Sequence, residues 1–321
     1  MGIEADFETA RRQVEAKRRS ITDKRISLEE AVALVRDGNV VAVGGCLYSR
    51  TPIGLLWALI RRRRRNLTLV RNLTCYEAEL LMVADAVDRL VTSWVGIALP
   101  WGLSRIFREY VESGRVVFEE WSHLALGLRL RAAAMGVPFL PTFSMLGSDL
   151  LKTSKAQTIT CPFTGKTVCL VPALFPDVAL IHVHRADPYG NAQIDGYPHM
   201  DQDLAAAAAT VIVSAERVVD PEEIRRSGDR TVIPFFAVDA VVELPYGAYP
   251  HECYGLYEAD FAHLETYARR ASAEGEAWVR SYLEEFFHGP SSFSEYLARF
   301  GLGSLLETGR RARILVGGGI S

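Results

Sequence analysis

Short apolar runs alternate with longer helical stretches along the first half of the chain. The run 40–43 is apolar throughout and short, which is typical of a strand buried on both faces of a parallel sheet. Gly44 and Gly45 follow it, and the apolar run 53–60, with Pro52 before its first turn, predicts a helix. Strand, glycine turn and helix in this order form a ligand loop at the carboxyl end of a strand in many α/β proteins.

The same alternation continues to the middle of the chain and beyond it. The pattern predicts strands at 67–70, 90–95, 116–118, 178–183, 211–213 and 240–242, and helices at 28–35, 77–86, 104–112, 123–135, 203–210 and from 221. The polar stretch 150–170 interrupts this rhythm and predicts an excursion or hairpin, and the chain reads as helical from 257. Alternating β and α elements predict an α/β fold with a central, mostly parallel sheet flanked by helices.

The sequence has no long linker and no internal repeat, so we expect one α/β domain over residues 26–308. Residues 1–25 are polar and rich in basic side chains, which predicts an N-terminal arm. Residues 309–321 are rich in Gly and Arg, a composition typical of a disordered tail.

Composition limits the classes of function. The chain has 321 residues, 49% of them apolar, and a formal net charge of −3, which suits a globular protein with a large core. No basic stripe is interleaved with aromatic residues, and no apolar run approaches the ~20 residues that span a bilayer, so we expect neither nucleic acid nor membrane as a partner. The five cysteines have no paired spacing, which argues against zinc, and their odd number without a signal peptide predicts a cytoplasmic protein.

Two positions carry candidate chemistry on residue type alone. Glu119 and Glu120 follow a predicted strand and precede a predicted helix, where a carboxylate can act as acid or base if burial raises its pKa. Simple first-turn helix charge is the alternative. Strand alternation directs only one of the two acids into a crevice. Ser49 and Arg50 lie in the glycine loop, where the arginine could hold a carboxylate bidentately or be a surface residue.

Other polar positions have simpler explanations. Turn chemistry accounts for Ser148, Asp149 and Asn191 without a ligand. His182 and His184 alternate on a predicted strand as in some metal sites, but no third ligand stands near them in the sequence.

The string around the glycine loop resembles the first signature of the family I coenzyme A transferases. Asp37-Gly38, the apolar run 41–43, Gly44-Gly45 and Pro52 match that signature. Cys46 stands where Phe is usual, and Arg50 where Gly is usual; an Arg there is similar to the glutaconate-transferase-like A subunits. Further stretches that are similar to this subfamily are 119–122, 136–141, 146–149 and 186–191, and the resemblance spans about residues 27 to 300.

The resemblance implies the coenzyme A transferase fold and the role of an A (alpha) subunit that moves CoA between carboxylic acids, dicarboxylic or oxo acids among them. The family's nucleophilic glutamate lies in a Ser-Glu-Asn-Gly-like string of the B (beta) subunit, and no such string occurs in this sequence. A B subunit in a heterotetramer or larger assembly is therefore the implied partner. A coenzyme A thioester is the implied substrate, with no metal and no tightly bound cofactor.

The resemblance also selects site residues. Glu120 aligns with an essential glutamate of related ring-cleaving hydrolases and is the expected catalytic residue. The expected substrate-binding residues are Gly44, Gly45, Tyr48, Ser49, Arg50, Ser148, Asp149 and Asn191. The alternative is an acyl-CoA hydrolase, ring-opening enzyme or decarboxylase that uses Glu120. Related folds also serve as effector-binding domains of sugar-responsive regulators, but residues 1–26 are too short for the helix-turn-helix of such proteins.

Overall fold

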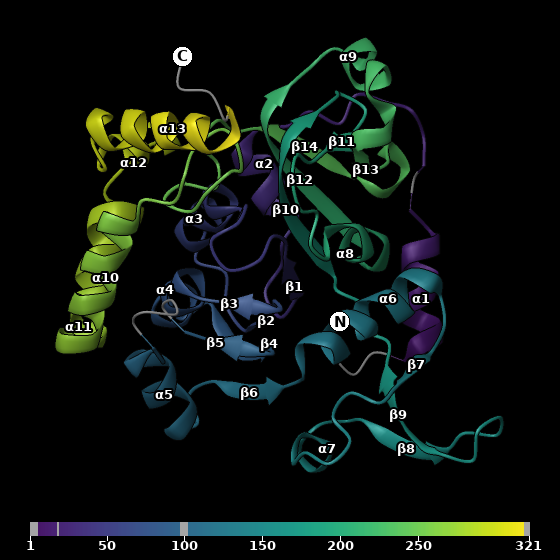
Figure 1. Cartoon of the computed structure of the whole chain (residues 1–321). Helices are drawn as coiled ribbons and strands as arrows, with labels where there is room; N and C mark the ends of the chain where they lie inside the picture. The colour runs from purple at the N-terminus through teal and green to yellow at the C-terminus, as the bar shows by residue number, and fades with distance from the viewer. Residues whose placement is uncertain (1–5, 18, 97–101, 318–321) are drawn as a thin grey trace.

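The computed structural model describes residues 6–17, 19–96 and 102–317. A sheet runs through the centre of the molecule (Figure 1). Seven strands are parallel to their neighbours, in the spatial order β14 (Ala240–Glu243), β12 (Thr210–Val218), β10 (Val178–Ala186), β1 (Val40–Val43), β2 (Leu67–Val70), β4 (Val87–Thr92) and β6 (Val117–Glu120). Two short strands, β11 (Ala192–Gln193) and β13 (Thr231–Ile233), continue the sheet antiparallel beside the end of β10. The predicted central, mostly parallel sheet is confirmed.

The strand order reverses between β1 and β10. From β1 the chain adds β2, β4 and β6 on one side, and it then returns to add β10, β12 and β14 on the other side of β1. Loops that leave two neighbouring strands in opposite directions open a crevice at the carboxyl ends of those strands. The glycine loop follows β1, so the topology places it at this reversal point.

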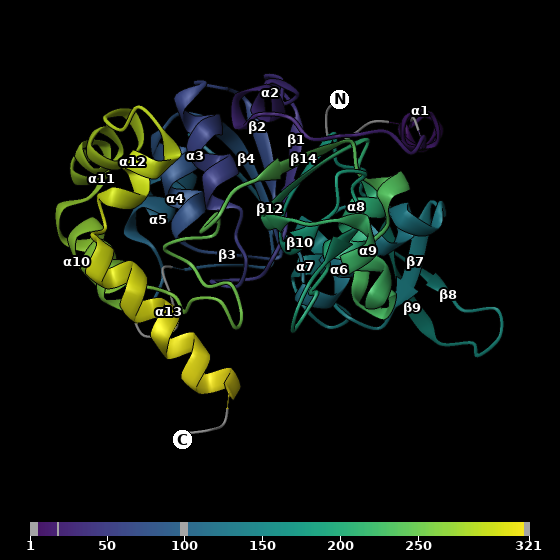
Figure 2. The ribbon, with the colours of Figure 1, turned by 90° about the horizontal axis from the view of Figure 1, so that it is seen from above.

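Strand alternation divides the core into two layers. Val41 and Val43 pack on one face of the sheet, and Val40 and Ala42 on the other. Helices cover both faces (Figure 2). The first face carries α2 (Leu28–Ala33), α3 (Ile53–Arg61), α4 (Tyr76–Val83) and α5 (Arg105–Glu112), with α10 (Phe261–Glu274), α11 (Glu276–Leu283), a π-helical turn (Glu284–His288) and α12 (Phe293–Ala298) outside them. The second face carries α6 (His123–Met135) and α8 (Asp201–Ala207).

A small antiparallel sheet projects from the body beside α6 (Figures 1 and 2). Its strands are β7 (Phe139–Thr142), β9 (Thr167–Pro172) and β8 (Gln157–Thr160), in that spatial order, with α7 (Leu150–Thr153) before β8. The polar stretch 150–170 thus forms the predicted hairpin. Two further strands, β3 (Leu73–Thr74) and β5 (Trp94–Val95), pair with each other beyond the ends of β2 and β4, and the apolar pattern alone does not separate them from those strands.

The two ends of the chain are helical. Residues 7–15 of the predicted arm form α1 (Phe7–Glu15). At the other end, α13 (Leu302–Gly317) continues through residues 309–317, where composition predicts a disordered tail; residues 318–321 lie outside the described ranges. Local interactions explain the difference, because Arg310 and Arg311 both pair with Glu307 one helical turn away and Ala312 is buried.

The remaining elements are α9 (Pro221–Arg226) and two single 3-10 turns, Gly228–Arg230 and Phe235–Ala237. Within the described ranges, none of the helices combines the length and the apolar character needed to cross a bilayer.

Candidate functional site at the end of strand β1

The loop 44–52 closes on itself directly after β1. Cys46 and Ser49 exchange two backbone hydrogen bonds of 3.0 and 2.8 Å, which fold the loop into a tight turn. Gly45 has φ +69°, and a side chain there would run into the carbonyl oxygen of Ser49. A side chain at Gly44 would lie 2.8 Å from the carboxylate of Asp201. The close approach of backbone to neighbouring groups therefore requires both glycines.

Asp201 joins the two ends of this loop. It is the first residue of α8, and its carboxylate accepts hydrogen bonds from the backbone N–H of Gly45 (2.8 Å) and from the guanidinium of Arg50 (2.6 Å). Arg50 also donates to the carbonyl oxygens of His182 (3.0 Å) and Tyr197 (2.8 Å). The sequence predicts that Arg50 holds a substrate carboxylate. In the structure the carboxylate it holds is Asp201, so a ligand contact through Arg50 stays a prediction that requires these bonds to rearrange.

A second buried arginine, Arg71, also bonds to the loop. Arg71, at the end of β2, donates to the carbonyl oxygen of Leu47 (3.0 Å) and the hydroxyl of Thr51 (2.8 Å), and it forms an ion pair with Glu77. The hydroxyl of Thr51 also lies 2.6 Å from Nδ1 of His251. Burial holds the pKa of His251 well below its usual range, so the imidazole is neutral. Buried, directional hydrogen bonds thus fix the side of the loop that faces Arg71 and His251.

The loop also contacts the segment 246–258. Glu252 exchanges backbone hydrogen bonds with its neighbours in the loop, donating to Tyr48 (2.8 Å) and accepting from Arg50 (2.9 Å). The ring of Tyr48 packs edge-on against His251 and Phe261. Burial and the nearby Glu258 raise the pKa of the half-buried Glu252. This carboxyl group beside the loop is one that sequence reasoning missed, because nothing local distinguishes it from a surface glutamate.

The two acids of β6 differ in environment. Glu119 is buried, and its carboxylate accepts hydrogen bonds from the indole of Trp121 (2.8 Å) and the guanidinium of Arg129 (2.9 Å). Glu120 is exposed, and no hydrogen bond or ion pair joins its carboxylate to another residue of the described ranges. Strand alternation therefore separates the two side chains as expected. With β2 and β4 between β1 and β6, Glu120 stands roughly 14 Å along the sheet from the loop, and its catalytic role stays a prediction.

Three polar residues lie between the loop and β6. Asn72 and Ser93 follow β2 and β4, and His123 begins α6. The hydroxyl of Ser93 donates to the side-chain oxygen of Asn72 (2.9 Å) and lies 3.4 Å from Nδ1 of His123. Each of them lies within two residues of the carboxyl end of a strand or opens the next helix. That position is the signal by which the sequence could have revealed them.

The remaining predicted site residues lie elsewhere. Ser148 donates to the carbonyl oxygen of Met145 (2.8 Å), and the exposed Asp149 pairs with Lys152, so both take part in the turn before α7. Asn191 bonds to the carboxylate of Asp187 (2.7 Å) and accepts the backbone N–H of Phe235 (3.0 Å). These bonds match the turn chemistry that the sequence also allows, and a ligand role for the three residues stays a prediction.

Two buried clusters have the residue types of metal ligands, Cys75–Glu77–His251 and His182–Glu216–Cys253. In the first cluster, the Arg71 cation already pairs with Glu77, which disfavours a second cation. In the second, Glu216 accepts hydrogen bonds from the ring of His182 (2.8 Å), the hydroxyl of Tyr257 (2.5 Å) and the backbone N–H of Tyr246 (2.8 Å). Burial raises the pKa of Cys75 and Cys253 well above the usual value, so both thiols keep their protons. Neither cluster favours a metal ion.

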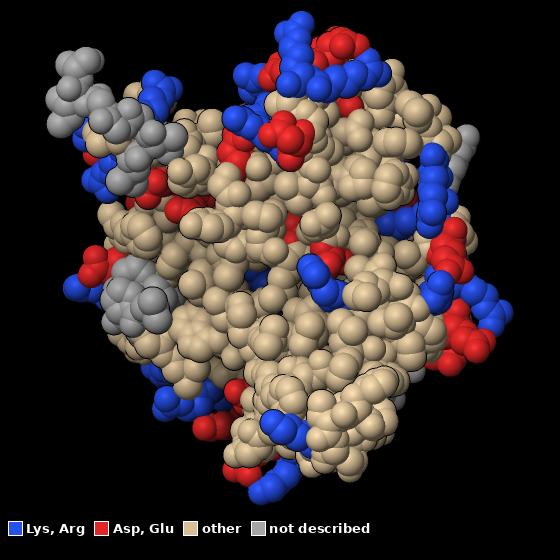
Figure 3. Space-filling model, turned by 45° about the vertical axis from the view of Figure 1, so that its right-hand side comes forward, with Lys and Arg blue, Asp and Glu red and all other residues tan. Residues whose placement is uncertain are grey.

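Figure 3 shows the molecule with the right-hand side of Figure 1 brought forward. Lys, Arg, Asp and Glu gather along the margins of this face, while its middle is largely uncharged and hollowed. A wide uncharged surface with a charged rim is typical of a protein that contacts another protein or a ligand there.

The strand reversal at β1 and β10, with a braced glycine loop at the carboxyl end of β1, is the arrangement at which open α/β sheets generally bind their ligands. The sequence model of the family described as coenzyme A transferase matches residues 25–244. The chain belongs to the coenzyme A transferase family, as the glycine-loop signature indicates.

Relatives with assigned names place it among the A subunits. The chain is 31% identical to the A subunit of glutaconate CoA-transferase from Acidaminococcus fermentans over 302 residues, which cover 88% of this chain and 94% of the relative. It is 33% identical to the cholesterol ring-cleaving hydrolase IpdA subunit of Rhodococcus jostii, with 81% and 93% covered. A further relative is an uncharacterised protein of Archaeoglobus fulgidus. The two sequences are 42% identical over 92% of this chain, and this chain spans 66% of the length of that relative.

Two solved structures are similar over most of the chain. The crystal structure of glutaconate coenzyme A-transferase from Acidaminococcus fermentans superposes with a TM-score of 0.84 at 31% identity, covering 89% of this chain and 95% of that chain. A variant of the decarboxylase AibA/AibB superposes with a TM-score of 0.72 at 34% identity, covering 82% and 99%.

Proposed function

We propose that this chain is the A subunit of a heteromeric CoA-transferase that moves CoA between carboxylic acids, dicarboxylic or oxo acids among them, with its nucleophilic glutamate supplied by a B subunit. One observation carries the proposal. The loop at the crevice is rigidly braced, yet two glutamates at this edge, Glu77 and Glu119, are buried and ion-paired to Arg71 and Arg129. The loop can shape an acyl pocket, but neither carboxylate is free to attack a thioester.

The partner's glutamate would attack the thioester carbonyl, release the CoA thiolate and form an acyl–glutamyl anhydride. The thiolate would then attack the glutamyl carbonyl of that anhydride, which frees the first carboxylic acid and leaves a glutamyl-CoA thioester. A second carboxylate reverses these steps and leaves with CoA. This chain's contribution is to hold the acyl group through the loop 44–52, whose shape Asp201 and Arg71 fix.

The test is to co-express the chain with a candidate partner and to follow the transfer of CoA from acetyl-CoA to dicarboxylates. Borohydride reduction of the turning-over complex, followed by peptide mass spectrometry, marks the glutamate that carries CoA. We expect exchange only from the complex, which would contain at least two copies of each chain, and a mark on the partner. A mark on this chain, or full turnover by this chain alone, would refute the proposal.

A second candidate keeps the same scaffold and uses Glu120 for acyl-CoA hydrolysis, ring opening or decarboxylation. The observation that favours it is the exposed Glu120 without a partner among the described residues, together with the similarity to a decarboxylase and to a ring-cleaving hydrolase. Glu120→Gln in the assembled complex separates the two candidates. Loss of activity there, with Glu112→Gln as the exposed control, favours this candidate; retained CoA exchange favours the transferase.

A further inference from the structure

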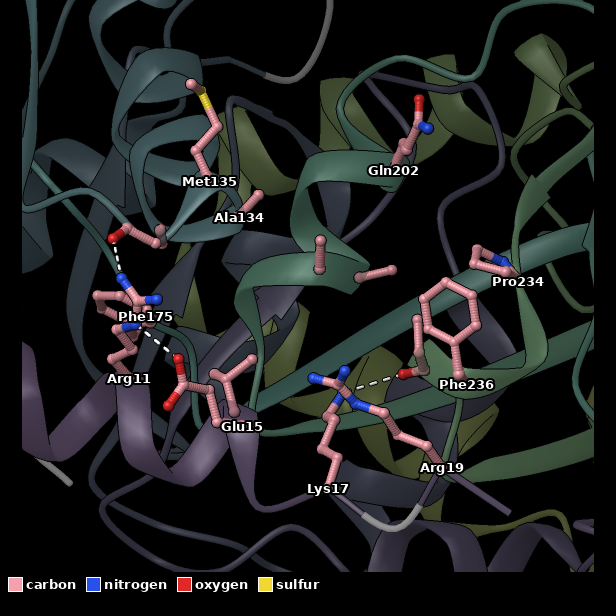
Figure 4. Close-up of a pocket in the computed structure, with 16 residues that line it drawn as sticks. Arg11, Glu15, Lys17, Arg19, Ala134, Met135, Phe175, Gln202, Pro234 and Phe236 are labelled. Atoms are coloured by element: carbon pink, nitrogen blue, oxygen red, sulfur yellow. Dashed lines mark hydrogen bonds and ion pairs between the residues drawn. The ribbon is translucent and has the colours of Figure 1, made fainter. Parts of the chain in front are cut away.

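A cavity of about 400 Å³ lies outside the glycine loop and its supporting residues (Figure 4). Its walls come from α1, from the last turn of α6, from the outer side of α8 and from the segment 234–237. The volume falls within the range of ~300–1,000 Å³ that is usual for small-molecule sites. None of the residues predicted to bind the acyl group lines it.

The floor of this cavity is apolar. Four alanines form it, Ala133 and Ala134 of α6 with Ala205 and Ala206 of α8. Two large apolar side chains stand on opposite sides of it, Met135 with 61% of its surface exposed and Phe236 with 47% exposed (Figure 4). Exposed apolar side chains around a concave surface lose this contact with water when a ligand covers them.

Cations line one side of the cavity. Arg11 is bound to Glu15 (2.7 Å) and to the carbonyl oxygen of Gly136, and Lys17 to the carbonyl oxygen of Ala237 (2.9 Å) and to Asp239 (3.4 Å). Arg19 differs, because no hydrogen bond or ion pair joins it to the rest of the described chain. Its guanidinium converges with the Lys17 side chain at the cavity wall (Figure 4).

The electrostatics of this wall favour an anion. The Lys17 side chain is 6% exposed. Burial lowers the pKa of Lys17; Asp239 acts in the opposite direction, and Arg19 and Lys24 lower it further. Arg19 and Lys24 therefore repel the Lys17 ammonium, and Asp239 is the one acidic group that offsets them at Lys17. Glu15, the one acid among the described residues that line the cavity, is already paired with Arg11. A bound carboxylate would relieve this repulsion.

We propose that this cavity binds a small organic anion with an aliphatic body, a monocarboxylate whose head contacts Arg19 and Lys17 and whose chain lies on the alanine floor. This site is separate from the acyl-CoA chemistry proposed above. Its occupant would nevertheless touch Gln202 and Ala205 of α8, the helix whose first residue, Asp201, holds the glycine loop. A ligand here therefore contacts the same rigid element that fixes the loop.

Octanoate is the probe, and isothermal titration on the full chain is the measurement. We expect octanoate to bind the unmodified protein, and Arg19→Ala to weaken binding about tenfold, the usual effect of losing one charge-assisted hydrogen bond. Arg12→Ala is the control, because it removes another exposed arginine of the same segment that does not line the cavity. Octanol, which has the chain without the charge, should bind more weakly than octanoate.

A second variant tests the floor. Ala206→Trp should fill the cavity and abolish binding, whereas Ala273→Trp, at an exposed alanine of α10, should leave it unchanged. Equal affinity of octanoate for all four variants, or equal affinity for octanol and octanoate, would overturn the proposal. So would binding that disappears when the partner chain is added, because the cavity would then belong to an interface between the two chains.

Discussion

The carboxylate of Asp201 lies 2.6 Å from the guanidinium of Arg50, and each side chain is only 1% exposed. Removing two charges from water costs free energy that their attraction barely recovers, so such a pair is weak evidence for stability by itself. The ion pair instead fixes the conformation of the loop. Arg50 has φ +50°, a region that L residues rarely adopt, and the pair holds it there while the same carboxylate accepts the N–H of Gly45.

Breaking this pair from one side should be costly. Asp201→Asn leaves a buried, uncompensated guanidinium, and Arg50→Met leaves a buried carboxylate, so we expect each to lower the free energy of unfolding by roughly 3–5 kcal/mol. The double variant should lose less than the sum of the two, because neither charge is then left unpaired. Urea denaturation followed by tryptophan fluorescence measures all three.

The control for these variants is Asp203→Asn on the same helix. Asp203 pairs with Arg131, whose side chain is mostly exposed, and an exposed pair contributes ~0–1 kcal/mol. Losses that simply add in the Arg50/Asp201 double variant would show that the two residues act independently.

The sequence pattern predicts the helices, strands and turns that are determined by residues close together along the chain. The strand 40–43, the glycine turn and the helix after Pro52 lie within one continuous stretch, and their apolar periodicity is strong enough to define them. The hairpin in 150–170 follows from its polar, turn-rich composition. Only residues 309–317 of helix α13 differ from the expectation, because composition there suggests flexibility, whereas ion pairs between side chains one turn apart stabilise a helix.

The site itself was only partly accessible from sequence. The pattern located Arg50 in the loop, but its partner Asp201 is 151 positions away, and nothing local reveals that the guanidinium is buried. The same holds for His251, which reaches Thr51 across 200 positions. Such contacts arise when strand order brings distant loops to one edge of the sheet, so the fold has to be known before the partners can be found.

Thr51 tests the support beneath the loop. Its hydroxyl accepts from Arg71, lies 3.0 Å from the carbonyl oxygen of Leu47 and lies 2.6 Å from His251. Thr51→Val keeps the shape of the side chain and removes all three contacts. Leaving buried polar partners unsatisfied should lower the free energy of unfolding by about 1–3 kcal/mol. In the assembled complex it should also raise KM for the acyl substrate more than it lowers kcat, if the loop only binds the acyl group.

Thr266→Val on α10 is the matched control, because that exposed hydroxyl bonds only to its own helix. Its effect should stay within ~0.5 kcal/mol. A Thr51→Val variant as stable as this control, with unchanged KM, would mean that the bonds beneath the loop contribute nothing to its shape.

The two acids of β6 should respond oppositely to the same change. Glu119→Gln removes the charge that balances the buried Arg129, and we expect a loss of roughly 3–5 kcal/mol in the free energy of unfolding. Glu120→Gln alters an exposed side chain and should change it by no more than ~0.5 kcal/mol. Thermal unfolding of the two variants side by side gives the comparison. Similar melting temperatures for both would mean that the Glu119–Arg129 pair does not stabilise the fold.

Glu79 should make the stability of the fold depend on pH. Burial raises its pKa to about 7, although Ser104 and the hydroxyl of Tyr267 (2.9 Å) both bond to the carboxyl group. In the unfolded chain a glutamate ionises near its ordinary pKa of ~4.3. Ionisation therefore opposes folding: the penalty is absent below pH ~4.3, grows as pH rises, and is complete above pH 7, at about 4 kcal/mol.

Glu79→Gln removes this titration, because the amide stays neutral at every pH. Its free energy of unfolding relative to the unmodified protein should therefore increase by up to ~3 kcal/mol between pH 5 and pH 8, whatever the absolute cost of the substitution. Denaturant unfolding at a series of pH values measures the difference. Glu112→Gln, at an exposed position on α5, should give a difference that does not vary with pH. A flat difference for Glu79→Gln as well would show that Glu79 ionises in the folded protein as it does in the unfolded chain.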